Sequence, residues 1–165
     1  MSGANLALGG LHHVALPVSD LDRSVAWYED VLLARVDRRT DTDLRDVAAA
    51  RSRQAWMAVG GVVINLAEGE RVARRDDQHF FHYALQAGHG NLDAWMEHLA
   101  GQRVKVLGPY GHGGLPFVSL YFDDPDDYRW ELVIDFDSYE LARQVARQRG
   151  GSLGNPTASY AWPDS

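Results

Sequence analysis

Residues 11–32, LHHVALPVSDLDRSVAWYEDVL, contain a strand pattern followed at once by a helix pattern. Apolar side chains alternate along residues 11–18, which is typical of a half-buried strand. Ser19 and Asp20 then offer an N-cap, and apolar residues follow at helical spacing. These residues are Leu21, Val25, Tyr28 and Leu32. The stretch therefore predicts a strand that runs directly into an amphipathic helix.

The same pattern returns at residues 79–99, HFFHYALQAGHGNLDAWMEHL. His82 with its Tyr-Ala-Leu matches His13 with its Val-Ala-Leu, and a tryptophan-containing helix follows each at nearly the same distance. Internal repetition of this kind indicates a duplicated supersecondary unit. After each helix we expect three more strands, so the predicted order is βαβββ, twice. In the second half these strands are predicted over 103–107, 115–122 and 128–135, with a glycine-rich loop over 109–114.

The predicted fold class is α+β, with two βαβββ modules that form one domain around a curved mixed sheet. The modules are expected at about 11–78 and 79–136. A flexible lead-in over residues 1–10 precedes them. A C-terminal helix over 137–149 and a tail over 150–165 follow them. Tyr160 and Trp162 in this tail either contact a partner subunit or close over the pocket, although disorder is the default for such a composition.

The composition is that of an ordinary globular protein, with 165 residues, 45% hydrophobic and 24% charged. The absence of cysteine excludes disulfides, a thiolate nucleophile and cysteine-ligated metal sites. The net charge of −7 argues against nucleic acid or an anionic membrane as the main partner. No apolar run approaches the ~20 residues of a transmembrane helix, and residues 1–10 lack a basic signal-peptide region. We therefore expect a cytoplasmic enzyme or binding protein.

Alternation along the strands predicts which side chains share the face that the helices leave uncovered. On this face we expect His13, Trp56, Asn65, His82, Gln86, Ser119, Tyr121 and Glu131. The same alternation sends His12 to the helix side. Two imidazoles and one carboxylate from different strands can bind a divalent metal and leave positions open for substrate. The sequence thus predicts a metal site at His13, His82 and Glu131, against the simpler alternative of half-buried structural histidines.

Residues 11–32, FHYAL at 81–85 and SLYFDDPDDYRWEL at 119–132 resemble the vicinal oxygen chelate superfamily. This superfamily contains glyoxalase I, fosfomycin-resistance transferases and type I extradiol dioxygenases. The resemblance covers about residues 11–136. Its metal positions fall on the same two histidines and glutamate that strand alternation selects.

Within this superfamily, the order His112, Leu120-Tyr121, Asp124-Pro125 and Glu131 is similar to that of type I extradiol dioxygenases. The resemblance implies a small single-domain oxidoreductase that opens a catechol, such as L-DOPA in antibiotic biosynthesis, to a semialdehyde. It implies Fe(II) and dioxygen, with His112 as the acid–base residue and Tyr121 orienting a ring oxygen. The predicted substrate-binding residues are Trp56, Asn65, Gln86 and Ser119.

Two other functions stay open. One is a fosfomycin-type thiol transferase, or another metal-dependent member of the superfamily, with Mn(II) in place of Fe(II). Ser119-x-Tyr121 is similar to such transferases, whereas Ala15 stands where they have Thr. The other is a metal-free resistance protein that binds an antibiotic. Because a single pair of modules leaves a pocket open, we also expect a homo-oligomer.

Overall fold

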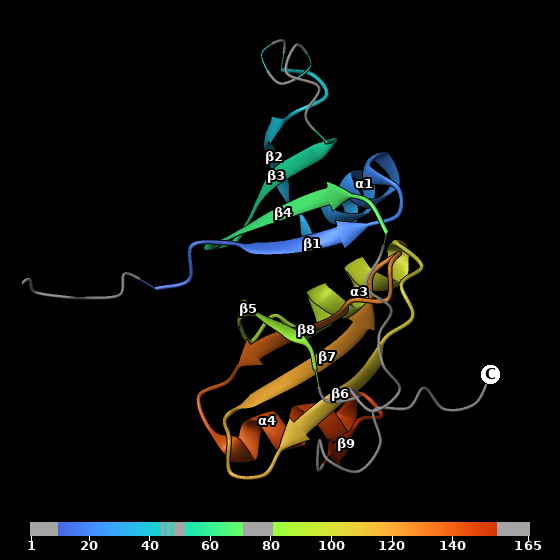
Figure 1. The fold of residues 1–165 in the computed structure, drawn as a ribbon. Helices are drawn as coiled ribbons and strands as arrows, with labels where there is room; N and C mark the ends of the chain where they lie inside the picture. Colours follow the sequence, from blue (N-terminus) through green and yellow to red (C-terminus); the bar gives the residue numbers. More distant parts are fainter. Residues whose placement is uncertain (1–9, 44, 46, 48–51, 71–80, 155–165) are drawn as a thin grey trace, which may run out of the picture. The chain divides into compact units, whose positions relative to one another are not determined.

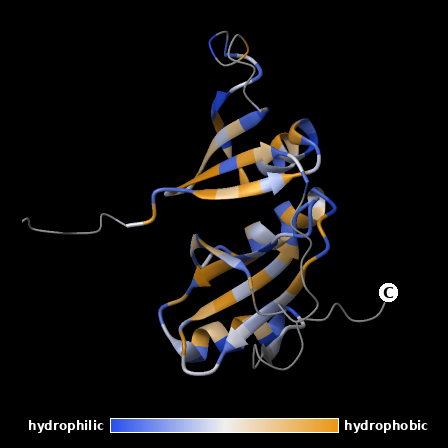
Figure 2. Ribbon diagram, viewed as in Figure 1, coloured by the Kyte–Doolittle hydropathy of each residue, from blue (hydrophilic) through white to orange (hydrophobic). Residues whose placement is uncertain are grey.

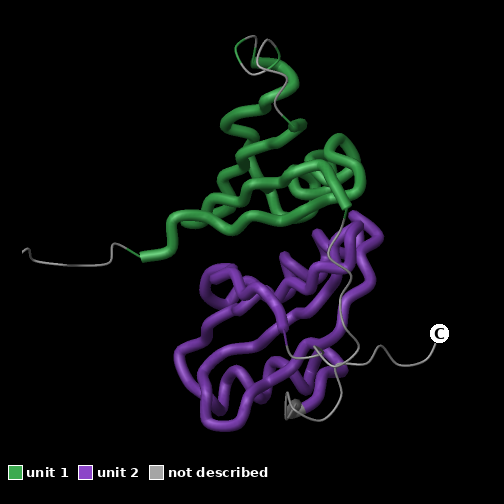
Figure 3. Tube along the Cα trace, in the orientation of Figure 1, with its two compact units in different colours: residues 1–71 green, residues 72–165 purple. Residues whose placement is uncertain are grey.

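The structure is a computed structural model that describes residues 10–43, 45, 47, 52–70 and 81–154 (Figure 1). The chain divides into two compact units, residues 1–71 and 72–165 (Figure 3), and each is described by itself below. Apolar residues are frequent in the strands, and polar residues are frequent in the loops that connect them (Figure 2). Within the described ranges, no helix is long and apolar enough to cross a membrane.

Unit 1 is a four-stranded mixed sheet in the order β1-β4-β3-β2, with one long helix packed on it. Its elements are β1 (Val14–Val18), α1 (Leu21–Leu32), β2 (Arg35–Arg39), β3 (Gln54–Val59) and β4 (Val62–Glu68). β1 runs parallel to β4, and the other pairs are antiparallel. The Asp20 carboxylate accepts a hydrogen bond from the Arg23 backbone N–H at 3.0 Å, so α1 begins at the predicted N-cap.

The core of unit 1 lies between α1 and one face of the sheet. The predicted helix stripe is buried, as are the sheet residues Leu16, Met57, Ile64 and Leu66. Each buried aliphatic side chain of this size contributes about 1.5–3 kcal/mol by leaving water. Strand pairing sets Ala15 and Trp56 on either side of Asn65, and alternation puts this row on the opposite face.

Unit 2 is a five-stranded mixed sheet in the order β5-β8-β7-β6-β9. Its elements are β5 (Tyr83–His89), α3 (Leu92–Gly101), β6 (Leu107–His112), β7 (Phe117–Asp123), β8 (Arg129–Asp135), α4 (Tyr139–Gln148) and β9 (Ser152–Gly154). β5–β8 and β6–β9 are parallel, and the other pairs are antiparallel. The described elements of unit 1 therefore follow the order βαβββ, and those of unit 2 follow it with α4 and β9 added, which confirms the predicted fold class.

Three boundaries differ from the sequence predictions. The strand predicted over 103–107 and the loop predicted over 109–114 are replaced by one strand, Leu107–His112. Gly108, Pro109 and Gly111 are typical of loops, but β6 pairs with β7 on both sides of an irregularity at 108–109, and its last three residues also pair with β9. These pairings outweigh the local preference for a loop. β1 and β5 also begin later than predicted, so His13 and His82 each precede the first strand residue.

The C-terminal part of unit 2 is more structured than a plain tail. α4 contacts β6, β7 and β9, and its buried residues are Ala142 and Ala146. Ser152–Gly154, within the segment predicted as a tail, forms β9 beside β6. Tyr160 and Trp162 lie outside the described residues, as does the lead-in over 1–9.

An ion-pair network joins the helix of unit 1 to its sheet. Arg39 on β2 pairs with Asp22 on α1 at 2.5 Å and with Asp41 at 2.7 Å. Arg53 pairs with the same two carboxylates at 2.7 and 3.1 Å and with Glu68 on β4 at 2.6 Å. The network therefore links three elements of the unit, α1, β2 and β4, through two guanidiniums.

We predict that Asp41→Asn lowers the free energy of unfolding by about 1 kcal/mol, or Tm by about 2–4 °C. Hydrogen bonding from Arg39 lowers the pKa of Asp41 from 3.8 to about 2. Because the folded pKa lies below the unfolded one, this stabilisation is complete above pH 4 and is lost as the pH falls toward 2. The measurement is urea unfolding between pH 2 and 7.

The matched control is Asp37→Asn, which removes the exposed ion pair between Asp37 and Arg35 on β2. This variant should unfold within about 0.5 kcal/mol of the unmodified chain. Equal destabilisation by the two variants would contradict a special role for the network.

We also predict that Gly108→Ala destabilises unit 2 by about 1–3 kcal/mol. Gly108 has a φ of +125°, and a Cβ there would lie 2.7 Å from the Ser119 carbonyl oxygen. Glycine at position 108 thus allows β6 to lie close to β7 beside Ser119. Thermal unfolding measures the effect, with Gly113→Ala as control because a Cβ at Gly113 meets nothing within 4 Å. Similar Tm values for both variants would refute the prediction.

Candidate functional site

β7 and β8 bring three polar side chains to one face of the sheet of unit 2. Tyr121 pairs directly opposite Glu131, and Ser119 lies two residues before Tyr121 on the same face. All three are buried, with exposed fractions of 0% for Ser119, 3% for Tyr121 and 5% for Glu131. Leu107 and Tyr110 on β6 pack against the Tyr121 ring. A buried carboxylate at the centre of such a row needs hydrogen-bond donors.

The two oxygens of Glu131 have different partners. Oε1 accepts hydrogen bonds from Ser119 Oγ at 2.5 Å and Tyr121 Oη at 2.8 Å. Oε2 lies 2.8 Å from His82 Nε2. Burial by itself would raise the pKa of Glu131, but the hydrogen bonds from His82, Ser119 and Tyr121 outweigh it and hold the pKa below its usual value. Glu131 is therefore ionised at neutral pH.

His112 extends this cluster from the end of β6. It is 7% exposed, its Nε2 lies 2.8 Å from Ser119 Oγ, and its ring packs against Phe117 with centroids 4.8 Å apart. Burial lowers its pKa, and the positive field of His82 acts in the same direction, although Glu131 opposes both. His112 is thus a buried strand residue rather than a histidine in a glycine-rich loop.

The other predicted residues of the first module lie together in unit 1. The rings of His13 and Trp56 have centroids 5.1 Å apart, and Trp56 pairs with Asn65 across β3 and β4. His12 contacts His13 directly, with their Nδ1 atoms 2.8 Å apart. The prediction that His12 points to the helix side is therefore wrong, because strand alternation does not apply before β1 begins at Val14.

Gln86 lies apart from the Glu131 cluster. It is exposed on β5, opposite Val133, and its Nε2 donates to Asp135 Oδ2 at 2.7 Å. Sequence reasoning also missed Arg129, which lies on the Glu131 face of β8. Its fully buried guanidinium bonds both oxygens of Asp123, at 2.9 and 3.1 Å. Strand alternation could have identified Arg129, because it lies two residues before Glu131 and so shares its face of β8. In the structure Asp123 pairs directly opposite it.

The contact between His82 and Glu131 suits a divalent metal. Neighbouring ligands in an octahedral shell with bonds of about 2.1 Å lie about 3 Å apart, and the 2.8 Å between Nε2 and Oε2 is close to that. An imidazole and a carboxylate suit Mn(II), Fe(II) or Zn(II). The described ranges contain no cluster of three or more His, Cys, Asp or Glu side chains placed to bind a metal. The structure thus joins two of the three predicted ligands, and His13 lies in the other unit.

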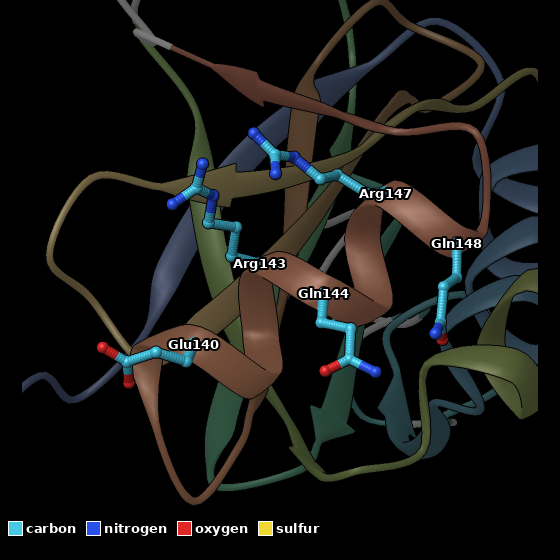
Figure 4. A pocket seen from close by; sticks show the side chains of 5 residues that line it. All are labelled: Glu140, Arg143, Gln144, Arg147 and Gln148. Atoms are coloured by element: carbon cyan, nitrogen blue, oxygen red, sulfur yellow. The ribbon is translucent and has the colours of Figure 1, made fainter.

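A surface hollow of about 370 Å³ lies elsewhere, along α4. It is lined by Glu140, Arg143, Gln144, Arg147 and Gln148, and Figure 4 shows all five side chains projecting from this one helix. None of the predicted site residues lines it. The hollow is therefore separate from the Glu131 cluster.

Comparisons with known proteins point away from a dioxygenase. The chain is 25% identical over 123 residues to the metallothiol transferase FosB of Staphylococcus saprophyticus, covering 74% of each chain. It is 26% identical over 136 residues to the fosfomycin resistance protein FosX of Mesorhizobium japonicum, covering 82% of this chain and 93% of that one. The predictions of an extradiol dioxygenase, an oxidoreductase activity and a catechol such as L-DOPA are therefore wrong.

Solved structures support the same fold. A variant of FosX from Listeria monocytogenes, complexed with Mn(II) and 1S,2S-dihydroxypropylphosphonic acid, matches with a TM-score of 0.64 and 22% identity. The match covers 83% of this chain and all of the other. Nothing in these comparisons supports Fe(II) or dioxygen. The model of the Glyoxalase/Bleomycin resistance protein/Dioxygenase superfamily matches residues 10–132, and the chain therefore belongs to this superfamily.

Proposed function

We propose that the protein is a Mn(II)-dependent enzyme of the fosfomycin-resistance type, which opens the epoxide of a small phosphonate by adding a thiol or water. The observation that carries the proposal is the buried Glu131 carboxylate, which meets His82 through one oxygen and two hydroxyl donors through the other. The similarity to FosB and FosX over about three quarters of the chain supports the substrate class.

The proposed metal ligands are His82 and Glu131 from unit 2 and His13 from unit 1. Three ligands of this type leave coordination positions for a substrate. When bound, the metal would act as a Lewis acid that stabilises negative charge on the epoxide oxygen. The absence of cysteine agrees with a site built from imidazole and carboxylate alone.

The proposed reaction forms one bond to carbon, breaks another, and moves one proton from the nucleophile to the ring oxygen. The sulfur of a thiol, or the oxygen of water, bonds to an epoxide carbon while the bond from that carbon to the ring oxygen breaks. The nucleophile loses its proton, and the ring oxygen gains one and becomes a hydroxyl group. Ser119 and Tyr121 would hold the Glu131 carboxylate in place throughout. Trp56 and Asn65 remain predicted substrate-binding residues, and the homo-oligomer and cytoplasmic location also stay predictions.

The test is consumption of fosfomycin with Mn(II), followed by ³¹P NMR, in parallel with and without glutathione. A thiol adduct identifies a transferase, and a diol formed without thiol identifies a hydrolase. We predict that Glu131→Gln lowers the rate at least about 100-fold, because the amide keeps the size of the side chain but loses the charge that binds the metal. Glu140→Gln, an equivalent change on the surface of α4, should leave the rate unchanged.

Two results would contradict the proposal. One is the absence of fosfomycin consumption in both arms when Mn(II) is bound. The other is an equal rate for Glu131→Gln and the unmodified protein, which would remove Glu131 from the site.

A further inference from the structure

A continuous chain of hydrogen bonds connects His112 to the proposed metal ligand Glu131. It runs from His112 Nε2 to Ser119 Oγ at 2.8 Å and from Ser119 Oγ to Glu131 Oε1 at 2.5 Å. The residues come from three adjacent strands, β6, β7 and β8, and all three side chains are buried. With water excluded, the partners of each polar atom in this chain are set by the protein itself.

The protons along this chain can be assigned by counting donors. A carboxylate that binds a metal is ionised and can only accept hydrogen bonds. The single hydroxyl hydrogen of Ser119 must therefore point to Glu131 Oε1. Ser119 Oγ then accepts from His112, so a neutral His112 carries its hydrogen on Nε2. All the hydrogen bonds therefore run in one direction: His112 donates to Ser119, and Ser119 donates to Glu131.

This direction determines which oxygen of Glu131 remains for a metal. Oε1 receives two hydroxyl hydrogens, from Ser119 and Tyr121. Oε2 faces His82 Nε2 at 2.8 Å. A hydroxyl group can turn about its C–O bond to suit its partners, and a donor on its lone pair limits the directions left for its hydrogen. The Nε2–H of His112 removes that freedom, and the packing of its ring on Phe117 fixes where the donor lies.

We infer that His112 is a positioning residue for the metal ligand Glu131: acting through Ser119, it holds Oε1 and thereby presents Oε2 to the metal beside His82. The inference rests on the proposed function, since it assigns His112 a task in that metal site. It replaces the acid–base role expected for His112 in a dioxygenase. The partners of metal ligands typically affect metal affinity about 10–100-fold, which sets the expected size of the effect.

The experiment measures Mn(II) affinity from the EPR signal of free Mn(II), without any substrate. His112→Phe keeps a ring against Phe117 but removes the donor, and we expect about tenfold weaker binding. His112→Gln places an amide N–H near the position of Nε2 and should restore most of the affinity. The matched control is His89→Phe, at an exposed histidine of β5, which should bind as the unmodified protein does.

A double-mutant cycle tests whether His112 and Ser119 act on Glu131 through one series of hydrogen bonds or through two independent contacts. Ser119→Ala should weaken Mn(II) binding as His112→Phe does, and the double variant should add little to either, because all three break the same connection. Additive losses, or unchanged affinity in His112→Phe, would overturn the inference. Failure of His112→Gln to recover affinity while its fold is intact would do so as well.

The proton assignment has a test that needs no metal. In the metal-free protein, ¹⁵N NMR should show His112 as the Nε2–H tautomer, and Ser119→Ala should shift it away from that form. An Nδ1–H tautomer in the unmodified protein overturns the inference even if Mn(II) binds. If the tautomer is as assigned but the unmodified protein binds no Mn(II), the proposed function fails and the positioning role of His112 fails with it. The two failures are therefore distinguishable.

Discussion

The burial of the Glu131 carboxylate is the constraint around which unit 2 is organised. A buried ionised group is strongly destabilising unless donors replace its water. Those donors come from β7, as Ser119 and Tyr121, and from His82, which directly precedes β5. Each donor reaches Glu131 only in the observed pairing of β5 and β7 with β8. A shift of one residue in either pairing would turn alternate side chains to the other face and leave the charge without partners.

The two modules share an order of elements but differ in the chemistry of the uncovered face. In unit 1 this face carries Trp56 and Asn65, with His13 next to the tryptophan ring. In unit 2 it carries Glu131 and its donors. Duplication thus explains why a histidine precedes the first strand of each unit, whereas the carboxylate and its donors are particular to the second.

Much of this arrangement follows from the sequence, for an identifiable reason. β7 and β8 form a hairpin with a short turn, so alternation along each strand places Ser119, Tyr121 and Glu131 on one face once the pairing is known. The same reasoning fails for β6, because Gly108 and Pro109 lie in a strand that two neighbours stabilise. It also fails for His12, which lies before its strand begins. Alternation predicts faces reliably only inside a paired strand.

The incorrect prediction of the reaction has a related cause. The spacing of His112, Tyr121 and Glu131 suggested a dioxygenase, yet strand pairing alone accounts for it. Tyr121 is directly opposite Glu131, and His112 hydrogen bonds to Ser119 on the neighbouring strand. Any member of this fold that holds a buried carboxylate with donors from adjacent strands would show similar intervals, whichever substrate it takes. The spacing therefore indicates how a ligand is held, and the substrate must be sought in side chains that do not serve that purpose.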